Sequence, residues 1–468
     1  MPVAAQVMRH ASVRPGRIAV SGPEGDLTYA ELADRAGRAA RALADEGIGR
    51  GALVAVAQAD PVALLVAVLA ADLVGATPLL CDHAWSEERR AQVMAAVPVA
   101  ARFDDPLPEA DGPAVEHRPA PDDLTWACFS SGSTGRPRAV VRGRASWTAS
   151  FAHLDALTGI GPDDVVLIPG PLVSSLYGFA AVHTLAAGAT AVVPGRWSPG
   201  GLAEPLRRAT AVHVVPHRLP AVLDALGTAG GPLRTAVVGG AALDVAARTR
   251  AAAAGVRVVS YYGATELSFV AVDADGAGLR PFPGVEIDVR VPPGQVLGEV
   301  WVRSPWLCDG YLAGATGPLR QDNGWMTVGD LAEPHRPGEV LRLRGRGDGA
   351  IQTGGATVVP EDVEEVLRKV PGVDDVVVVG TPHPYLGAVV TAVVEGAVEG
   401  AVEGGAAGGG ASRAALEAAA RAELDPAQRP RRWYAAASLP RTPAGKPARG
   451  LLATRLAAGD DPGLRRLT

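Results

Sequence analysis

The sequence is poor in cysteine and lysine, and it has no long apolar run. Its three cysteines, Cys81, Cys128 and Cys308, form no CxxC pair and no metal-site spacing. A small and odd number of cysteines is typical of proteins in a reducing compartment. The most apolar run, residues 62–71, ends at Asp72 and falls short of the roughly 20 residues that span a bilayer. The first residues lack the apolar core of a signal peptide. We therefore expect a cytoplasmic protein without a membrane span.

The charge balance gives no reason to expect a polyanionic partner. The chain of 468 residues has 44 basic and 50 acidic side chains, a formal net charge of −6, which does not favour binding to nucleic acid or an anionic membrane. Apolar residues make up 48% and charged residues 20%, as in ordinary globular proteins of two or three domains. Composition does not indicate the oligomeric state.

Short apolar segments alternate with helical patterns along the first three quarters of the chain. Thr28-Tyr-Ala-Glu31 is a capping-box pattern that predicts the start of a helix. Apolar segments that predict buried strands lie at 53–57, 77–80, 165–168, 189–193, 211–215, 235–238 and 256–260. This alternation predicts an α/β fold of parallel-type sheets covered by helices, with ligands at the carboxyl ends of the strands.

The pattern changes after residue 346. Helices are expected at 361–368 and 413–424, and strands at 375–379, 389–394 and 432–437, which together predict a small α+β unit. The glycine-rich residues 395–410 are expected to form a loop without chemistry. We therefore predict a large domain, residues 1–347, and a small C-terminal domain, residues 348–468.

Residues 128–140 read CFSSGSTGRPRAV and combine glycine, hydroxyl and arginine side chains. Glycine lets several backbone N–H groups point at one anion, and the hydroxyl groups and Arg138 add donors and positive charge. The segment predicts a polyphosphate cradle, although a polar surface loop would explain the serines and glycines alone. It is not of the Walker type, which requires a Gly-Lys-Ser/Thr sequence.

Further motifs follow in order: YGATE at 262–266, GEVWVR at 298–303 with Gly310-Tyr311, Gly329-Asp330, GRGD at 345–348 and PRTPAGK at 440–446. Together with the cradle they resemble the superfamily of adenylate-forming enzymes, which includes acyl-CoA synthetases, adenylation domains of nonribosomal peptide synthetases and firefly-type luciferases. The resemblance covers almost the whole chain in one order. It implies activation of a carboxylic acid by ATP and Mg²⁺ in the large domain, with a mobile small domain as a lid.

The resemblance also implies a role for each motif residue. Those expected to bind the nucleotide are Ser130, Ser131, Gly132, Ser133, Thr134, Gly135, Arg138, Gly240, Tyr262, Gly263, Asp330 and Arg346. Within this set, Tyr262 stacks on adenine, Asp330 accepts the ribose hydroxyls, and Arg138 replaces the usual lysine. The implied catalytic residues are Thr265 at the α-phosphate, Glu266 at Mg²⁺, and Lys446 at the carboxylate. Asp348 is the implied hinge.

The acyl group is expected to be a short or aromatic acid. Amino-acid-activating relatives carry an aspartate in the segment that matches residues 171–179, but PLVSSLYGF has no acid here. Since burying an unpaired ammonium is costly, an α-amino acid is disfavoured. The residues expected to bind the acyl group are Ser174, Ser175, Tyr177, His217, Gly239 and Tyr261.

Three acceptors or reactions stay open. Residues 351–355 resemble the acyl-CoA synthetase pattern, with Gln352 where lysine is usual, and this favours CoA. A stand-alone adenylation enzyme would instead load the pantetheine of an external carrier protein. Adenylation of a non-carboxylate such as an inorganic oxyanion is the third possibility, and a catalytically inactive nucleotide-binding regulator is the non-enzymatic one. The HVVPH segment at 213–217 does not predict zinc, because Pro216 disfavours the required helix.

Overall fold

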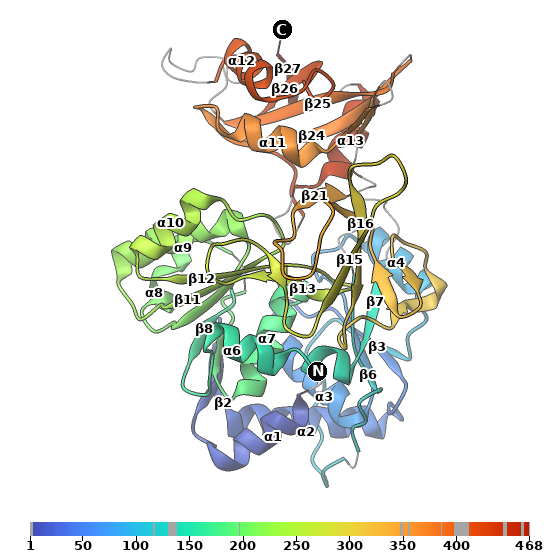
Figure 1. Cartoon of the computed structure of the whole chain (residues 1–468). Coiled ribbons are helices and arrows are strands. Elements are labelled where there is room, and N and C mark those ends of the chain that lie inside the picture. The colour runs from blue at the N-terminus through green and yellow to red at the C-terminus, as the bar shows by residue number, and fades with distance from the viewer. Residues whose placement is uncertain are drawn as a thin grey trace.

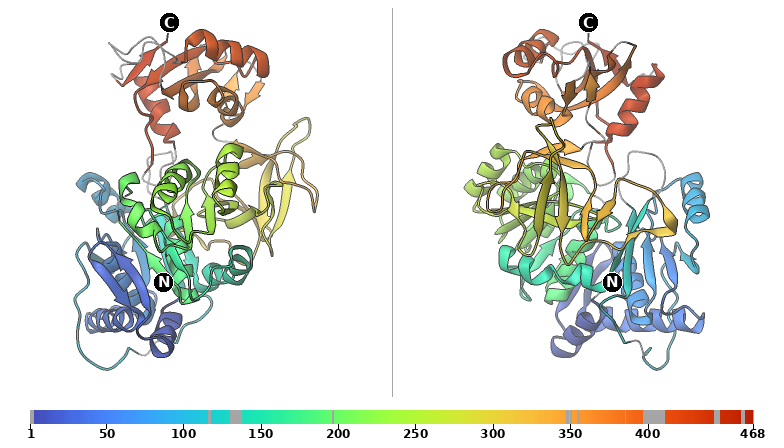
Figure 2. Two further views of the ribbon diagram at one scale, coloured as in Figure 1. Left: turned by 90° about the vertical axis from the view of Figure 1, so that its left-hand side faces the viewer. Right: turned by 45° about the vertical axis from the view of Figure 1, so that its right-hand side comes forward.

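The computed structural model describes residues 3–115, 118–129, 138–195, 197–346, 349, 351–353, 356–384, 386–396, 411–442, 447–459 and 463–467. A large N-terminal domain built on three sheets carries a small C-terminal domain at one end (Figure 1), and Figure 2 shows the same arrangement from two further directions. The expected mixed α/β class is confirmed. The domain boundary predicted at residues 347–348 lies outside the described residues and stays a prediction.

The first sheet has nine strands in the order β14-β13-β12-β11-β10-β8-β9-β1-β2. The central strands β12, β11, β10, β8, β9 and β1 run parallel, as the alternation of strands and helices predicts. The strand bounds are β1 Ile18–Gly22, β2 Gly25–Thr28, β8 Val165–Leu167, β9 Thr190–Val192, β10 Ala211–Val214, β11 Thr235–Gly239, β12 Arg257–Ala264, β13 Ser268–Asp273 and β14 Arg280–Pro281.

The second sheet has the order β17-β7-β6-β4-β3-β5, with parallel pairing from β6 to β5. Its strands are β3 Leu53–Val56, β4 Thr77–Leu80, β5 Ala101–Phe103, β6 Leu124–Phe129, β7 Ala139–Gly143 and β17 Gly310–Tyr311. Helix α3 (Pro61–Val74) contacts β1 of the first sheet and β3 and β4 of the second. Because it is buried on nearly every side, it is apolar all round.

The third sheet of the large domain was not predicted from the sequence. Residues 286–346 form an antiparallel sheet in the order β18-β19-β16-β20-β21, with β15 paired to β16. The strand bounds are β15 Glu286–Arg290, β16 Gly298–Arg303, β18 Arg320–Asp322, β19 Trp325–Thr327, β20 Asp330–Ala332 and β21 Leu343–Arg346. Short strands joined by hairpins pair with their neighbours without crossover helices, so this segment lacks the helical pattern of a parallel unit.

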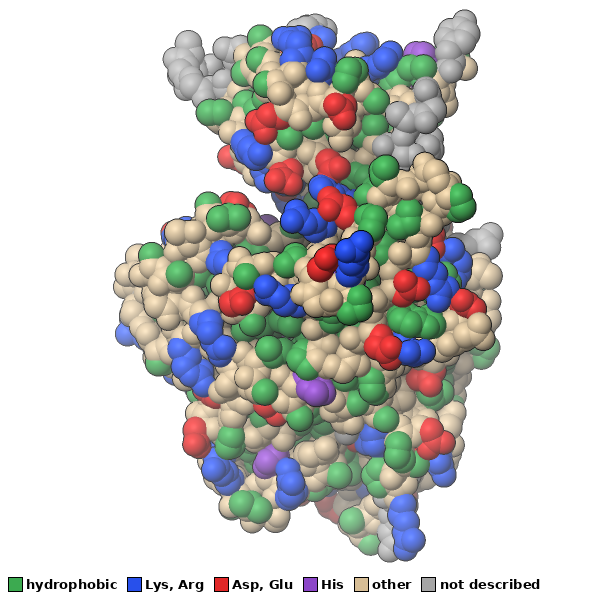
Figure 3. All heavy atoms as spheres, viewed as in Figure 1, with side chains coloured by type: hydrophobic (Ala, Val, Ile, Leu, Met, Phe, Trp, Pro, Cys, Tyr) green, Lys and Arg blue, Asp and Glu red, His purple; other side chains and the backbone are tan. Residues whose placement is uncertain are grey.

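The small domain has its own sheet in the order β23-β22-β25-β26-β27, with β24 paired to β25, and its own apolar core. Its elements are β22 Ile351–Thr353, β23 Ala356–Val358, α11 Pro360–Arg368, β24 Val373–His383, β25 Gly387–Gly396, α12 Arg413–Glu423, β26 Arg432–Ala436, α13 Arg449–Ala458 and β27 Leu464–Arg466. Arg344 on β21 forms an ion pair with Asp362 on α11 (3.3 Å). Figure 3 shows acidic and basic side chains between the two domains.

The remaining helices cover the sheets of the large domain. They are α1 Ala4–Val13, α2 Tyr29–Asp45, α4 Glu87–Ala96, α5 Arg144–Thr148, α6 Phe151–Thr158, α7 Ser175–Ala187, α8 Ala203–Leu206, α9 Leu219–Ala229 and α10 Val245–Ala253. The capping box predicted at Thr28 is confirmed: its hydroxyl accepts from the Glu31 N–H, and the Glu31 carboxylate accepts from the Thr28 N–H. Among the described residues, no helix is both long and apolar enough to cross a membrane.

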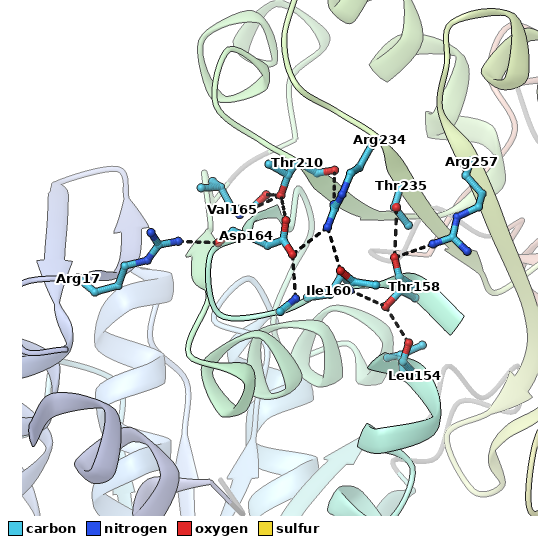
Figure 4. A network of polar contacts seen from close by, with 12 residues as sticks. Arg17, Leu154, Thr158, Ile160, Asp164, Val165, Thr210, Arg234, Thr235 and Arg257 are labelled. Carbon is cyan, nitrogen blue, oxygen red and sulfur yellow. Dashed lines mark hydrogen bonds and ion pairs between the residues drawn. The ribbon is translucent and has the colours of Figure 1, made fainter. Parts of the chain in front are cut away.

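A polar network joins the amino ends of the parallel strands (Figure 4). Asp164, which precedes β8, accepts from Thr210 before β10 (2.6 Å) and from Arg234 before β11 (3.0 Å). At the start of β12, Arg257 donates to the Thr158 carbonyl (2.8 Å). This edge of the sheet is held by its own side chains, and the residues predicted to bind substrate lie at the opposite edge.

Candidate active site

The residues predicted to bind the acyl group gather where the parallel strands of the first sheet end. Gly239 is the last residue of β11, and Tyr261 is its partner on β12. His217 follows β10 in a short 3₁₀ turn, and Ser175 begins α7. Since ligands of open α/β sheets bind outside the carboxyl ends of the strands, this placement agrees with the predicted site.

The YGATE motif lies at the end of a strand and in the tight turn that follows it. β12 continues to Ala264 because β13 pairs with it antiparallel. The strand thus extends beyond the predicted 256–260, and Tyr262 lies within it. A Cβ atom at Gly263 would lie 2.0 Å from the carbonyl oxygen of Ser268, so the hairpin requires glycine there.

Tyr262 and Asp330, predicted to bind adenine and ribose, contact each other directly. The Tyr262 hydroxyl donates to the Asp330 carboxylate with an Oη–Oδ2 distance of 2.6 Å. Asp330 begins β20 and is buried, and its strand partner on β21 is Arg346. The fold therefore brings together three residues that the sequence assigned to one nucleoside, and the contact joins the first sheet to the third.

Thr265 and Glu266 are held by contacts from distant parts of the chain. The hydroxyls of Thr265 and Ser175 are 2.9 Å apart, which places the start of α7 beside the YGATE turn. Glu266 is buried, and its carboxylate accepts a hydrogen bond from Tyr311 (Oη–Oε1 2.9 Å). Burial, followed by the charge of Glu266, raises the pKa of Tyr311, so the phenol keeps its proton and remains a donor.

Tyr311 is a site residue to which the sequence analysis gave no role. Gly310-Tyr311 appeared in the motif set, but nothing local showed that the side chain reaches Glu266. Arg138, at the described end of the predicted cradle, is buried and close enough to oppose the rise of the Tyr311 pKa. This places the end of the cradle near the carboxylate predicted to bind magnesium.

The described residues suit a magnesium ion held mainly by a nucleotide. No group of three or more His, Cys, Asp or Glu side chains in the described part of the chain could hold a metal alone. Mg²⁺ commonly binds through one or two carboxylates together with substrate phosphates. The buried carboxylate of Glu266 beside the end of the cradle fits that mode, and a protein-only metal cage is not required.

The buried Tyr177 and the half-buried Tyr261 cover glycines at the carboxyl edge of the first sheet. A Cβ atom at Gly170, after β8, would lie 2.1 Å from the ring of Tyr177, and one at Gly239 would lie 2.2 Å from the ring of Tyr261. Each ring therefore packs directly against the backbone of a glycine, where any larger residue would collide with it. Burial and then the charge of Arg218 lower the pKa of His217 to about 4, so this imidazole is neutral near pH 7.

Several predicted residues lie outside the described part of the chain. These are the cradle residues Ser130, Ser131, Gly132, Ser133, Thr134 and Gly135, the hinge residue Asp348 and the catalytic Lys446. Of the other predicted residues, Ser174 precedes α7, and Gly240 follows β11 with a positive φ of 97°.

Comparison with known proteins gives a consistent result. Residues 7–112 and 97–312 match the AMP-binding enzyme family, and residues 362–446 match the AMP-binding enzyme C-terminal domain. The uncharacterized acyl-CoA ligase YhfT of Bacillus subtilis is 32% identical over 363 residues, covering 74% of this chain and 69% of YhfT. Feruloyl-CoA synthase of an Amycolatopsis species is 28% identical over 425 residues, covering 82% and 86%.

Solved structures agree in fold. ATP-bound MatB from Rhodopseudomonas palustris superposes with a TM-score of 0.83 at 23% identity, covering 97% of this chain and 99% of MatB. At that identity the likeness concerns the fold alone, and it extends over both domains.

Proposed function

We propose that this chain, which belongs to the AMP-binding enzyme family and is an acid–thiol ligase, converts a carboxylic acid and ATP to an acyl-adenylate and pyrophosphate. A carboxylate oxygen attacks the α-phosphorus, and the bond from that phosphorus to the bridging oxygen of the β-phosphate breaks. A thiol then attacks the acyl carbon, AMP leaves, and the thiol proton is lost to solvent. CoA is the thiol that we propose.

The contact between Tyr262 and Asp330 is the observation that carries the proposal. The hydroxyl of Tyr262 and the carboxylate of Asp330 are joined by a hydrogen bond of 2.6 Å. The tyrosine ring offers a stacking surface for a base, and the carboxylate offers acceptors for ribose hydroxyls in the same site. Ala264, two residues after Tyr262, is the last residue of the strand. Thr265 and Glu266 follow it in the turn. Adenine, ribose and α-phosphate would therefore follow the course of the YGATE motif.

Each remaining residue is assigned a role in binding or orientation. The Thr265 hydroxyl would donate to the α-phosphate, and Glu266 would hold Mg²⁺, which when bound neutralises charge on the phosphate oxygens. Residues 132–135 would hold the β- and γ-phosphates. Lys446 would contact the reacting carboxylate. Because the step needs two anions aligned and charge stabilised, positioning and electrostatics supply most of the catalysis.

We propose a short or aromatic acid as the substrate. The residues 171–179 carry no carboxylate to pair with an α-ammonium. The rings of Tyr177 and Tyr261, packed against Gly170 and Gly239, support a compact acyl site. The feruloyl-CoA synthase relative adds support for an aromatic acid.

The test is a pyrophosphate-release screen over a panel of short, aromatic, long-chain and α-amino acids, with and without CoA. We expect ATP- and Mg²⁺-dependent release with a short or aromatic acid, and a thioester only when CoA is present. Release with a carrier protein but not with CoA would replace the proposed acceptor. Release with an inorganic oxyanion but with no acid would replace the proposed reaction, and failure of the folded protein to bind ATP would refute both.

A further inference from the structure

Arg142 is a charged side chain buried beside the predicted ATP site. It lies on β7 with 4% of its surface exposed. Its guanidinium donates to the carbonyl oxygen of Thr265 (Nη1–O 2.8 Å), to the carbonyl oxygen of Trp306 and to the hydroxyl of Ser146 (Nε–Oγ 3.1 Å). These partners are all neutral, and no ion pair joins Arg142 to a described carboxylate. An arginine stays charged even when burial lowers its pKa. The direct hydrogen-bond partners of this buried charge are neutral, and the nearby carboxylates of Asp309 and Glu266 favour its charged form without pairing to it.

The first carbonyl partner belongs to the turn that carries the predicted catalytic residues. Arg142 holds the backbone of Thr265, while Ser175 holds its hydroxyl (2.9 Å). In the next residue, Glu266, the carbonyl accepts from the Cys308 N–H (3.0 Å). The turn between β12 and β13 is thus fixed from β7, from α7 and from the segment that contains Cys308.

The second carbonyl partner belongs to the segment that leads to Tyr311. Trp306 is itself fixed, because its indole N–H donates to the Phe269 carbonyl on β13 (2.9 Å). Three residues on, the Asp309 carboxylate accepts from the N–H of Gly143, the neighbour of Arg142 (Oδ2–N 2.6 Å). One guanidinium therefore joins the backbone that carries Thr265 and Glu266 to the backbone that presents Tyr311 to Glu266.

We propose that Arg142 is a positioning residue for the adenylation step. By binding the carbonyls of Thr265 and Trp306, it fixes the Thr265 hydroxyl and the Glu266 carboxylate where they act on the α-phosphate and Mg²⁺. The inference rests on the proposed function. Among the described residues, the hydrogen bonds of Arg142 go to Thr265, Trp306 and Ser146 and not to Tyr262 or Asp330, so its loss should slow the chemical step and leave ATP binding nearly intact.

The test compares Arg142→Met, which removes every donor at similar length, with Arg142→Lys, which keeps the charge. We expect Arg142→Met to lower kcat for acid-dependent ATP–pyrophosphate exchange by about 100-fold, since misplacement by about 1 Å can cost that much. The Kd for ATP, measured by calorimetry, should change by less than about threefold. Arg142→Lys should restore part of kcat, because an ammonium can bind one carbonyl but not the whole set.

Arg144→Met is the matched control. Arg144 is two residues further along, also largely buried, and pairs with Asp72 (2.7 Å) without contacting Thr265 or Glu266. It should lower the thermal unfolding temperature at least as much as Arg142→Met, while kcat per folded enzyme stays near the wild-type value. Fractions folded are measured by circular dichroism under the assay conditions.

Three results would overturn the inference. The first is an Arg142→Met enzyme with wild-type kcat per folded molecule. The second is an Arg142→Met enzyme that has lost affinity for ATP but keeps its kcat. The third applies if Arg142→Met does not fold, and is a folded Arg142→Lys enzyme with wild-type kcat. A wild-type protein that shows no exchange with any acid would instead refute the proposed function, so the two failures are distinguishable.

Discussion

Replacement of Tyr262 by phenylalanine should weaken ATP binding through its effect on Asp330. The substitution keeps the ring that is proposed to stack on adenine and removes only the hydroxyl, which lies 2.6 Å from the Asp330 carboxylate. Asp330 is 5% exposed, so water replaces the lost donor poorly. A buried hydrogen bond to a charged group contributes about 1.5–3 kcal/mol. If about half of that, roughly 0.75–1.5 kcal/mol, is lost from ATP binding, Kd rises by about threefold to about twelvefold, since about 1.4 kcal/mol is tenfold.

The assay is calorimetry with ATP and with its 2′-deoxy and 3′-deoxy analogues. Asp330 is proposed to accept the ribose hydroxyls, so removing the Tyr262 hydroxyl and removing a ribose hydroxyl should affect the same carboxylate. The two losses should therefore be less than additive. Tyr262→Phe should reduce the binding free energy of both ATP and the deoxy analogues. For at least one deoxy analogue, we expect this reduction to be less than about half of the reduction for ATP.

Tyr29→Phe is the control for loss of a buried tyrosine hydroxyl. Tyr29 donates to the Ala189 carbonyl (2.8 Å) at a place far from the predicted nucleotide site, so its loss should cost stability without changing ATP affinity. The reasoning about Asp330 is refuted if Tyr262→Phe binds ATP like the wild type, or if it weakens ATP and both deoxy analogues by the same factor.

Three further predictions concern the small domain. Lys446→Ala should abolish adenylation with little change in ATP affinity, because the lysine is proposed to act on the reacting carboxylate; near-normal exchange would contradict this. Asp348→Pro should slow thioester formation from preformed adenylate far more than adenylation, since proline fixes φ at the proposed hinge; equal slowing in single-turnover kinetics would indicate a folding effect only. Arg449→Met should lower the free energy of unfolding of the small domain, measured in urea, by about 3–5 kcal/mol. The reason is that Arg449 donates to both carboxylate oxygens of the buried Glu364 and to the Val378 carbonyl (3.0 Å). A loss below about 1 kcal/mol would show that the pair contributes no more than an exposed ion pair.

The sequence predicted those parts of the fold that depend on local patterns. The capping box at Thr28 forms with both of its hydrogen bonds. Helix α3 is capped at its start by Asp60, whose carboxylate accepts from backbone N–H groups of the first turn, and at its end by Gly75 in the left-handed region. Strand and helix alternation was sufficient for the parallel sheets, because a buried parallel strand is apolar on both faces.

The sequence did not predict the third sheet or the contacts that complete the site. The strands of the third sheet are short and antiparallel, so neither their length nor a helical pattern distinguishes them from loops. Arg142 follows three apolar residues and resembles any strand arginine, although its partner Thr265 is 123 residues away. Tyr311 is 45 residues from Glu266. Such pairings depend on tertiary packing, which local spacing does not encode.

The proposed site requires the third sheet, although the sequence did not predict it. It supplies Asp330 and the backbone of Arg346 on adjacent strands, while the first sheet supplies Tyr262 and Thr265, and the second sheet supplies Arg142. A site assembled from three sheets depends on their mutual packing more than on any one of them. Substitutions that loosen the contact between β12 and β20 should therefore impair ATP binding even where they lie far from the nucleotide. By contrast, the amino edge of the first sheet is held by the Asp164 network. Substitutions there should change stability without moving Tyr262, Thr265 or Asp330.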